Sequence, residues 1–210
     1  MYKSKYFILS FFFSSIIFSY FNIEAQTAED FFNRGDLKAK NGDEIGAIED
    51  FTKSIKINPN DSKVYWSRGI IYYNQNYAIL AIDDYNKSLE LNPDDETTYY
   101  CRALAKSKLG DYKSAIQDFT KANTSNLPEQ FKTEVLMNRG IAKSQVGDNW
   151  GAISDFNISI EIDPNNAKTY YLRGIVKIIL NQKENGCLDL SKSGELGYVE
   201  AYNTIKTNCN

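Results

Sequence analysis

The sequence predicts an all-α fold in which five helical hairpins stack into a solenoid that ends in a capping helix. The first observation is an arginine followed by a small residue, which recurs at intervals of 34, 34, 37 and 34 residues. The members of this column are Arg34-Gly35, Arg68-Gly69, Arg102-Ala103, Arg139-Gly140 and Arg173-Gly174. A fixed period of this length indicates repeated supersecondary units, each of which contacts only its neighbours.

The second observation is a column of small residues in register with the first, each followed four residues later by a large apolar one. The small members are Ala47, Ala81, Ala115, Ala152 and Gly186, and the large ones are Phe51, Tyr85, Phe119, Phe156 and Leu190. Two antiparallel helices approach closely only where side chains are short, and a ring can fill the space beside the contact. We therefore interpret both columns as packing residues.

Turn residues divide each period into two helices. Proline lacks an N–H and has a fixed φ, so it ends a helix, and glycine permits the tight turn inside a hairpin. The unit ends are Asn58-Pro59, Asn92-Pro93 and Asp163-Pro164, and the turns within units are Asn41-Gly42-Asp43, Gly110-Asp111 and Gly147-Asp148.

A 34-residue hairpin with small, small, aromatic and proline columns resembles the tetratricopeptide repeat (TPR), here of a bacterial exported type. The resemblance implies a right-handed α-solenoid over residues 26–210. The expected repeats are 27–60, 61–94, 95–128, 129–166 and 167–196, with a cap over 197–210. The sequence departs from the family in its arginine column, where leucine is more common. It also departs in the three added residues near 123–128, where we expect a changed pitch or a looser joint.

Residues 1–25 have the pattern of a signal peptide, because Lys3 and Lys5 precede the apolar run 6–23. We expect cleavage after Ala25, which makes Gln26 the first residue of an exported protein, periplasmic or secreted. The alternative is an uncleaved membrane anchor, since about 18 apolar residues approach the roughly 20 that span a bilayer.

Composition excludes several classes of function. Hydrophobic residues make up 42% of the chain, which is enough for a packed core, and the net charge of -3 comes without a basic cluster for nucleic acid. Histidine is absent, which removes the commonest general base and metal ligand. No nucleophile elbow, P-loop or zinc-protease motif occurs. We predict no catalytic residues, no metal and no cofactor, and the remaining enzymatic idea is thiol chemistry at Cys187 and Cys209.

The family resemblance implies that first helices line a concave groove that binds a protein or peptide. One expected groove column is Phe32, Trp66, Tyr100, Met137 and Tyr171, and the column four residues on is Asp36, Ile70, Leu104, Ile141 and Ile175. Flanking polar candidates are Tyr73, Asn74, Lys108 and Gln145. The alternative is that some of these residues pack against neighbouring first helices. We favour Trp66, Tyr100 and Tyr171 as ligand contacts because large rings suit an interface.

The aspartates form a column of their own, Asp50, Asp84, Asp118, Asp155 and Asp189, in register with the arginines. One hypothesis is a ladder of Arg–Asp pairs within or between units. The alternative is a solvated edge, in which exposed pairs contribute only about 0 to 1 kcal/mol each.

The end of the chain predicts a cap and a disulfide. Val199, Tyr202 and Ile205 lie at helical spacing, so they are expected to form the apolar face of the capping helix. Cys187 and Cys209 are nearly symmetric about the turn after the fifth hairpin, which places them side by side in an antiparallel helix pair. Free buried thiols are the alternative for this pair. For Cys101 we expect an unpaired core position.

Two functions of different classes fit these features. The first is a binding module that captures a segment of another exported or envelope protein. The second is a structural subunit that is buried permanently in an envelope assembly. The sequence alone does not separate them, because a fold does not determine a function.

Overall fold

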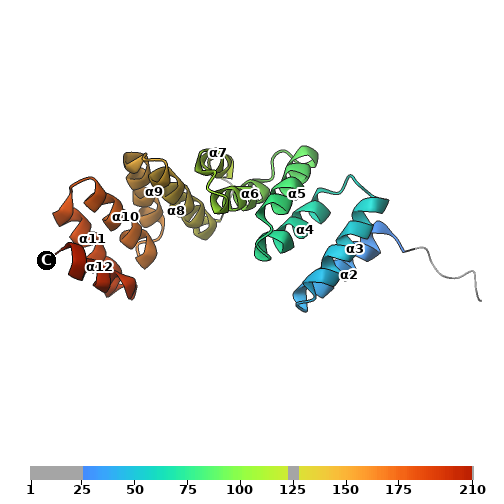
Figure 1. Cartoon of the computed structure of the whole chain (residues 1–210), viewed down its shortest axis with the longest axis horizontal. Helices are drawn as coiled ribbons and strands as arrows, with labels where there is room; N and C mark the ends of the chain where they lie inside the picture. The colour runs from blue at the N-terminus through green and yellow to red at the C-terminus, as the bar shows by residue number, and fades with distance from the viewer. Residues whose placement is uncertain (1–25, 123–127, 210) are drawn as a thin grey trace, which may run out of the picture. The chain divides into compact units, whose positions relative to one another are not determined.

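The computed structural model describes residues 26–122 and 128–209, and every regular element in these ranges is an α-helix (Figure 1). The helices are α2 (Ala28–Lys40), α3 (Glu44–Ile57), α4 (Ser62–Asn74), α5 (Ala78–Leu91), α6 (Glu96–Lys108), α7 (Tyr112–Ala122), α8 (Glu129–Gln145), α9 (Asn149–Ile162), α10 (Ala167–Ile179), α11 (Lys183–Glu195) and α12 (Glu200–Asn208). They form five hairpins and a terminal helix, which confirms the predicted all-α hairpin architecture. The predicted signal peptide lies outside the described residues, as does most of the irregular stretch 123–128. None of the described helices is long and apolar enough to cross a membrane.

The chain divides into two compact units, residues 1–59 and residues 60–210. The described part of the first unit is the single hairpin α2–α3. The second unit holds four hairpins and α12, and in it each second helix packs against the first helix of the next hairpin: α5 on α6, α7 on α8, and α9 on α10. This nearest-neighbour packing is that of a solenoid.

A residue in the left-handed conformation makes the turn inside each of the five hairpins, and a left-handed glycine, Gly197, precedes the cap. Gly42, Gly110 and Gly147 have φ of 81°, 80° and 85° at the predicted turns. The second and fifth hairpins turn at Asn76 and Asn181 instead, with φ of 66° and 60°. Asparagine tolerates this conformation better than other residues with a side chain. The same turn therefore occurs in hairpins whose sequence lacks the glycine.

The small residues of the first helices lie directly against the rings of the second helices. A Cβ added to Gly69 would lie 2.7 Å from the Tyr85 ring, and one on Gly140 would lie 2.6 Å from the Phe156 ring. Both rings are 1% exposed. The predicted packing role of the two columns is confirmed, because the close helix contact requires the missing side chain.

The arginine and aspartate columns form buried ion pairs inside every hairpin. Asp50, Asp84, Asp118, Asp155 and Asp189 are between 0% and 6% exposed. Each accepts hydrogen bonds on both carboxylate oxygens from the arginine sixteen residues earlier, at 2.6 to 2.8 Å. The prediction of Arg–Asp pairs is confirmed, and the alternative of a solvated edge is wrong because packing of the hairpins excludes water from the carboxylates.

A lysine four residues after the arginine joins four of these pairs. Lys38, Lys106, Lys143 and Lys177 lie 2.7 to 2.9 Å from the second carboxylate oxygen of their aspartates. In the second hairpin the same position is Tyr72. This lysine column was not predicted, although its spacing of four from the arginines places both on one helix face.

The irregular interval before the fourth hairpin lengthens its first helix. α8 has 17 residues, whereas α6 and α10 have 13 each. Arg139 lies ten residues after the start of α8, and Arg102 lies six residues after the start of α6. The fourth hairpin thus carries an extra helical turn, residues 129–132, at the start of α8.

The capping helix α12 packs differently from the prediction. Val199 and Tyr202 are 69% and 58% exposed, and Ala201 is the buried residue of the helix. Tyr202 lies across Gly194 of α11 and donates a hydrogen bond from its hydroxyl to the Gly194 carbonyl at 3.0 Å. The prediction is wrong for Val199, whereas Tyr202 contacts α11 although most of its surface is exposed, and Ile205 is half-buried.

Candidate functional site

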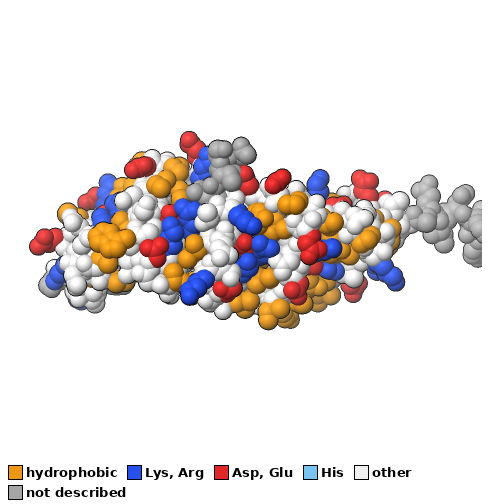
Figure 2. Space-filling view, turned by 90° about the horizontal axis from the view of Figure 1, so that it is seen from above, with side chains coloured by type: hydrophobic (Ala, Val, Ile, Leu, Met, Phe, Trp, Pro, Cys, Tyr) orange, Lys and Arg blue, Asp and Glu red, His pale blue; other side chains and the backbone are white. Residues whose placement is uncertain are grey.

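The surface that we call the first-helix face is formed by α4, α6, α8 and α10 in the second unit. Neighbouring first helices contact one another, since α4 approaches α6, α6 approaches α8, and α8 approaches α10. One aliphatic residue per helix lies on this face, each neither buried nor fully exposed: Ile70, Leu104, Ile141 and Ile175. Figure 2 shows one side of the molecule, where hydrophobic side chains alternate with charged ones. Four of the five members of this predicted column thus form a partly accessible aliphatic row, and the fifth, Asp36, lies in α2 of the first unit.

The α4 part of the face contains three half-buried candidates, Trp66, Ile70 and Tyr73. They pack against the buried cluster around Tyr85. Lys108 from α6 places its Nζ atom 4.7 Å from the centre of the Tyr73 ring, within the range of a cation–π contact. Burial also raises the pKa of Tyr73 above its ordinary value of 10.0, which disfavours the phenolate further. This end of the face is aromatic with a cationic rim.

Tyr100 belongs to the core, contrary to the prediction that its ring contacts a ligand. It is 8% exposed, and its ring packs edge-on against Phe131 with 4.7 Å between centroids. Phe131 lies in the extra turn of α8, so the irregular interval covers the tyrosine. The Tyr100 hydroxyl donates to Glu134 at 3.3 Å and accepts from Asn138 at 3.1 Å. Burial and the Glu134 carboxylate raise the pKa of Tyr100, which keeps this polar link between α6 and α8 protonated.

Met137 is the second predicted contact that lies in the core. It is 9% exposed and packs with Phe156 of α9 and Val176 of α10. Its flexible side chain fills the space between successive hairpins, which is a common use of methionine. Ile141, one turn further along α8, is packed against the same cluster but remains half-buried.

Tyr171 and Phe32 lie at the two ends of the predicted column. The Tyr171 ring packs against Tyr198 with 4.9 Å between centroids, and its hydroxyl lies 3.3 Å from that of Thr204 in the cap. Phe32 lies in the first unit, where it packs against Phe51 at 5.8 Å. Neither is fully buried, and the first-helix face of the second unit does not include Phe32.

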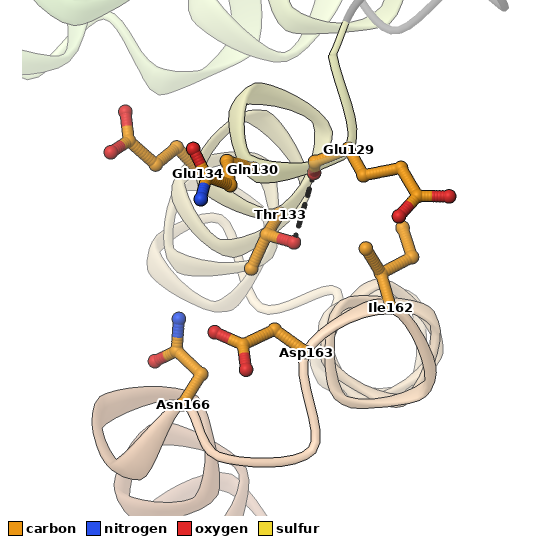
Figure 3. A pocket seen from close by; sticks show the side chains of 7 residues that line it. All are labelled: Glu129, Gln130, Thr133, Glu134, Ile162, Asp163 and Asn166. Carbon is orange, nitrogen blue, oxygen red and sulfur yellow. Dashed lines mark hydrogen bonds between the residues drawn. The ribbon is translucent and has the colours of Figure 1, made fainter.

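A polar pocket of about 480 Å³ lies between α8 and the turn from α9 to α10 (Figure 3). Its lining residues are Glu129, Gln130, Thr133, Glu134, Ile162, Asp163 and Asn166. Asp163 accepts a hydrogen bond from the Asn165 amide in the turn, and Asn166 accepts one from the Thr169 amide in the first turn of α10, each at 3.1 Å. The sequence did not predict this pocket, because it needs the extra turn of α8 and uses turn residues that also cap a helix. Within the described ranges, no cluster of residues suits a metal ion.

The cysteines offer no thiolate at neutral pH. Burial raises the pKa of the Cys101 thiol to about 11, so this thiol stays protonated. The sulfur atoms of Cys187 and Cys209 are joined in a disulfide, with 2.03 Å between them. A nucleophilic role would need a thiolate, which neither the protonated Cys101 thiol nor the Cys187–Cys209 disulfide supplies.

Comparison with known proteins identifies the repeat in the first half of the chain. Tetratricopeptide repeat models match residues 31–61, 62–95 and 84–117, so the chain contains tetratricopeptide repeats. Comparison with curated proteins gave no match.

Several solved structures share the fold. The chain in a crystal structure of MamA has 22% sequence identity to this chain. The alignment covers 80% of this chain and 96% of the MamA chain, with a TM-score of 0.73. YrrB, described as a TPR protein with an unusual peptide-binding site, is 20% identical over 85% of this chain and 92% of its own, with a TM-score of 0.77. PilF from Pseudomonas aeruginosa is 15% identical over 81% of this chain and 76% of its own, with a TM-score of 0.68.

Proposed function

We propose that this protein is an exported, non-enzymatic interaction scaffold whose first-helix face binds a segment of another protein. The observation that carries the proposal is the aliphatic row of Ile70, Leu104, Ile141 and Ile175, which remains partly exposed across four successive helices. Large apolar side chains that line up on a surface are typical of interaction sites. Burying them under a partner contributes about 25 cal/mol for each Å² of apolar surface removed from water.

The surroundings of the row define the chemistry of the partner segment. Trp66 and Tyr73 add aromatic surface at the α4 end, and the exposed side chains of Asn74 and Gln145 supply amide groups at the rim. Amide side chains both donate and accept hydrogen bonds, so they suit the backbone of a bound peptide. We therefore expect a segment with several aliphatic side chains rather than a highly charged one. The peptide-binding site named for YrrB supports a peptide as the ligand.

Export of the protein is part of the same proposal. The apolar run 6–23 after two lysines supports a signal peptide, and the disulfide between Cys187 and Cys209 suits an oxidising compartment. The partner would then be another exported or envelope protein.

A permanent structural subunit is the second candidate function. Large apolar residues are also exposed on the second helices, with Ile79 at 65% and Trp150 at 64%. Such residues on a face away from the aliphatic row favour an assembly that covers more than one side of the protein.

Affinity capture with residues 26–210 as bait distinguishes the two candidates. The variant of the first-helix face carries Leu104→Asp and Ile141→Asp. The matched control carries Ile79→Asp and Trp150→Asp on the second helices. A partner that is lost only from the first variant supports the binding module. Loss only from the second variant supports the structural subunit, and circular dichroism spectra must show that both variants remain helical.

A further inference from the structure

The cap region contacts the last hairpin through residues that precede the last turn of α12. Tyr198 contacts Tyr171, Tyr202 bonds to the Gly194 carbonyl, and Ala201 is buried. In the second half of α12, residues 206–208 are exposed. The disulfide joins this exposed end, at Cys209, to Cys187 near the start of α11. Each end of the cap therefore has its own attachment.

The cap covers one residue of the candidate site. Tyr171 belongs to the predicted ligand column, and its ring and hydroxyl contact Tyr198 and Thr204 of the cap region. Gly197, with φ of 96°, makes the turn between α11 and the cap. A left-handed glycine turn with few side-chain contacts is a suitable pivot for movement of α12. Movement of the cap away from α10 would leave Tyr171 accessible beside Ile175.

We propose that the Cys187–Cys209 disulfide is a redox-controlled latch that determines whether the cap covers Tyr171. Both cysteines are partly exposed, so a thiolate from a dithiol reductant can reach them. The thiolate attacks one sulfur, the other leaves as a thiolate, and the second thiol of the reductant displaces the protein from the mixed disulfide. The products are two cysteine thiols and one oxidised dithiol. In the reduced state α12 detaches more often, and Tyr171 joins the first-helix face.

Hydrogen exchange measured by mass spectrometry on residues 26–210 tests the latch directly. Samples are compared before and after treatment with dithiothreitol, together with the Cys209→Ser variant and a Cys101→Ser control. The latch predicts that amides of residues 198–209 exchange about 300-fold faster once the 22-residue loop is open, a size expected for loss of a loop of that length. Amides of α4 to α9 should keep their rates, and Cys101→Ser should behave as the oxidised wild type.

Hydroxyl-radical footprinting of Tyr171 supplies a second readout that follows the cap rather than overall stability. Labelling of Tyr171 should rise on reduction and return to its starting value on reoxidation. Unchanged exchange in 198–209 would overturn the proposal, as would faster exchange that spreads equally through α4 to α9. The effect of the latch on partner binding rests on the proposed function, but the opening of the latch does not. Because neither experiment contains a partner, a failed latch leaves the proposed binding function testable, and a failed binding function leaves the latch testable.

Discussion

Arg102 holds three helices together, because it binds Asp118 of its own hairpin and Asn86 of the preceding one. Its Nε and Nη2 atoms donate to the two Asp118 oxygens at 2.8 and 2.7 Å, and Nη1 donates to Asn86 at 2.8 Å. Arg173 repeats the arrangement with Asp189 and Asn157. A planar guanidinium with five donors in a fixed fork can make both sets of bonds at once. The arginine column therefore links hairpins as well as completing each one.

Replacing Arg102 by methionine should lower the free energy of unfolding by about 3 kcal/mol, because it leaves the Asp118 carboxylate buried with one partner fewer. Lys106 remains 2.7 Å from that carboxylate and limits the loss. The Arg68→Met variant should lose more, since Tyr72 occupies the lysine position of its hairpin. Urea unfolding followed by circular dichroism measures both values.

A double variant separates the charge effect from the loss of packing. Arg102→Met combined with Asp118→Leu should be more stable than Arg102→Met alone, because the charge then left without its partner is the more exposed Lys106 ammonium rather than the buried Asp118 carboxylate. Equal stability of Arg102→Met and the wild type would show that the pair contributes nothing and would contradict the account of the column.

Gly140→Ala should destabilise the fourth hairpin by about 1 to 3 kcal/mol. The new Cβ would lie 2.6 to 3.0 Å from atoms of the buried Phe156 ring, which must move. The matched control is Gly147→Ser, where nothing lies within 4 Å of an added Cβ and only the φ of 85° opposes the side chain. Thermal melts of both variants test the packing explanation. That explanation fails if Gly140→Ala has the same melting temperature as the wild type.

The regular period made most of the fold predictable. Each column has the same role in every copy, so the contact of Gly69 with Tyr85 could be inferred from the register alone. Accessibility was less predictable, because it depends on the neighbouring hairpin. Phe131 covers Tyr100 only because the 37-residue interval adds a turn to α8, and the same turn creates the polar pocket. Likewise the cap contacts Tyr171 through residues that have no counterpart in the repeat.

Acid should weaken the Arg34–Asp50 interaction. The hydrogen bonds from Arg34, with a further contribution from Lys38, hold the pKa of Asp50 well below its usual value of 3.8. The stabilisation is complete above the unfolded pKa, where both states are ionised, and is lost as the pH falls from there toward the folded pKa. Between pH 5 and pH 2 the wild type should thus lose more unfolding free energy than Asp50→Asn. Equal losses in the two proteins would contradict this role for Asp50.

Cys101 should react slowly with iodoacetamide in the folded protein. Its pKa of about 11, compared with an ordinary 9.0, reduces the thiolate fraction at pH 8 about 100-fold. The rate should rise about tenfold with each pH unit up to about pH 11 and should become normal in urea. A folded-state rate at pH 8 that matches a free thiol would show that Cys101 is not buried as described.

Photo-crosslinking tests most directly whether the first-helix face binds a protein. A benzophenone amino acid placed at position 141, on the aliphatic row, is compared with one at position 150, on the second helix of the same hairpin. The account predicts a defined crosslinked partner from position 141, reduced by Leu104→Asp, and none from position 150. Crosslinks to the same partner from position 150 alone would contradict the assignment of the binding face.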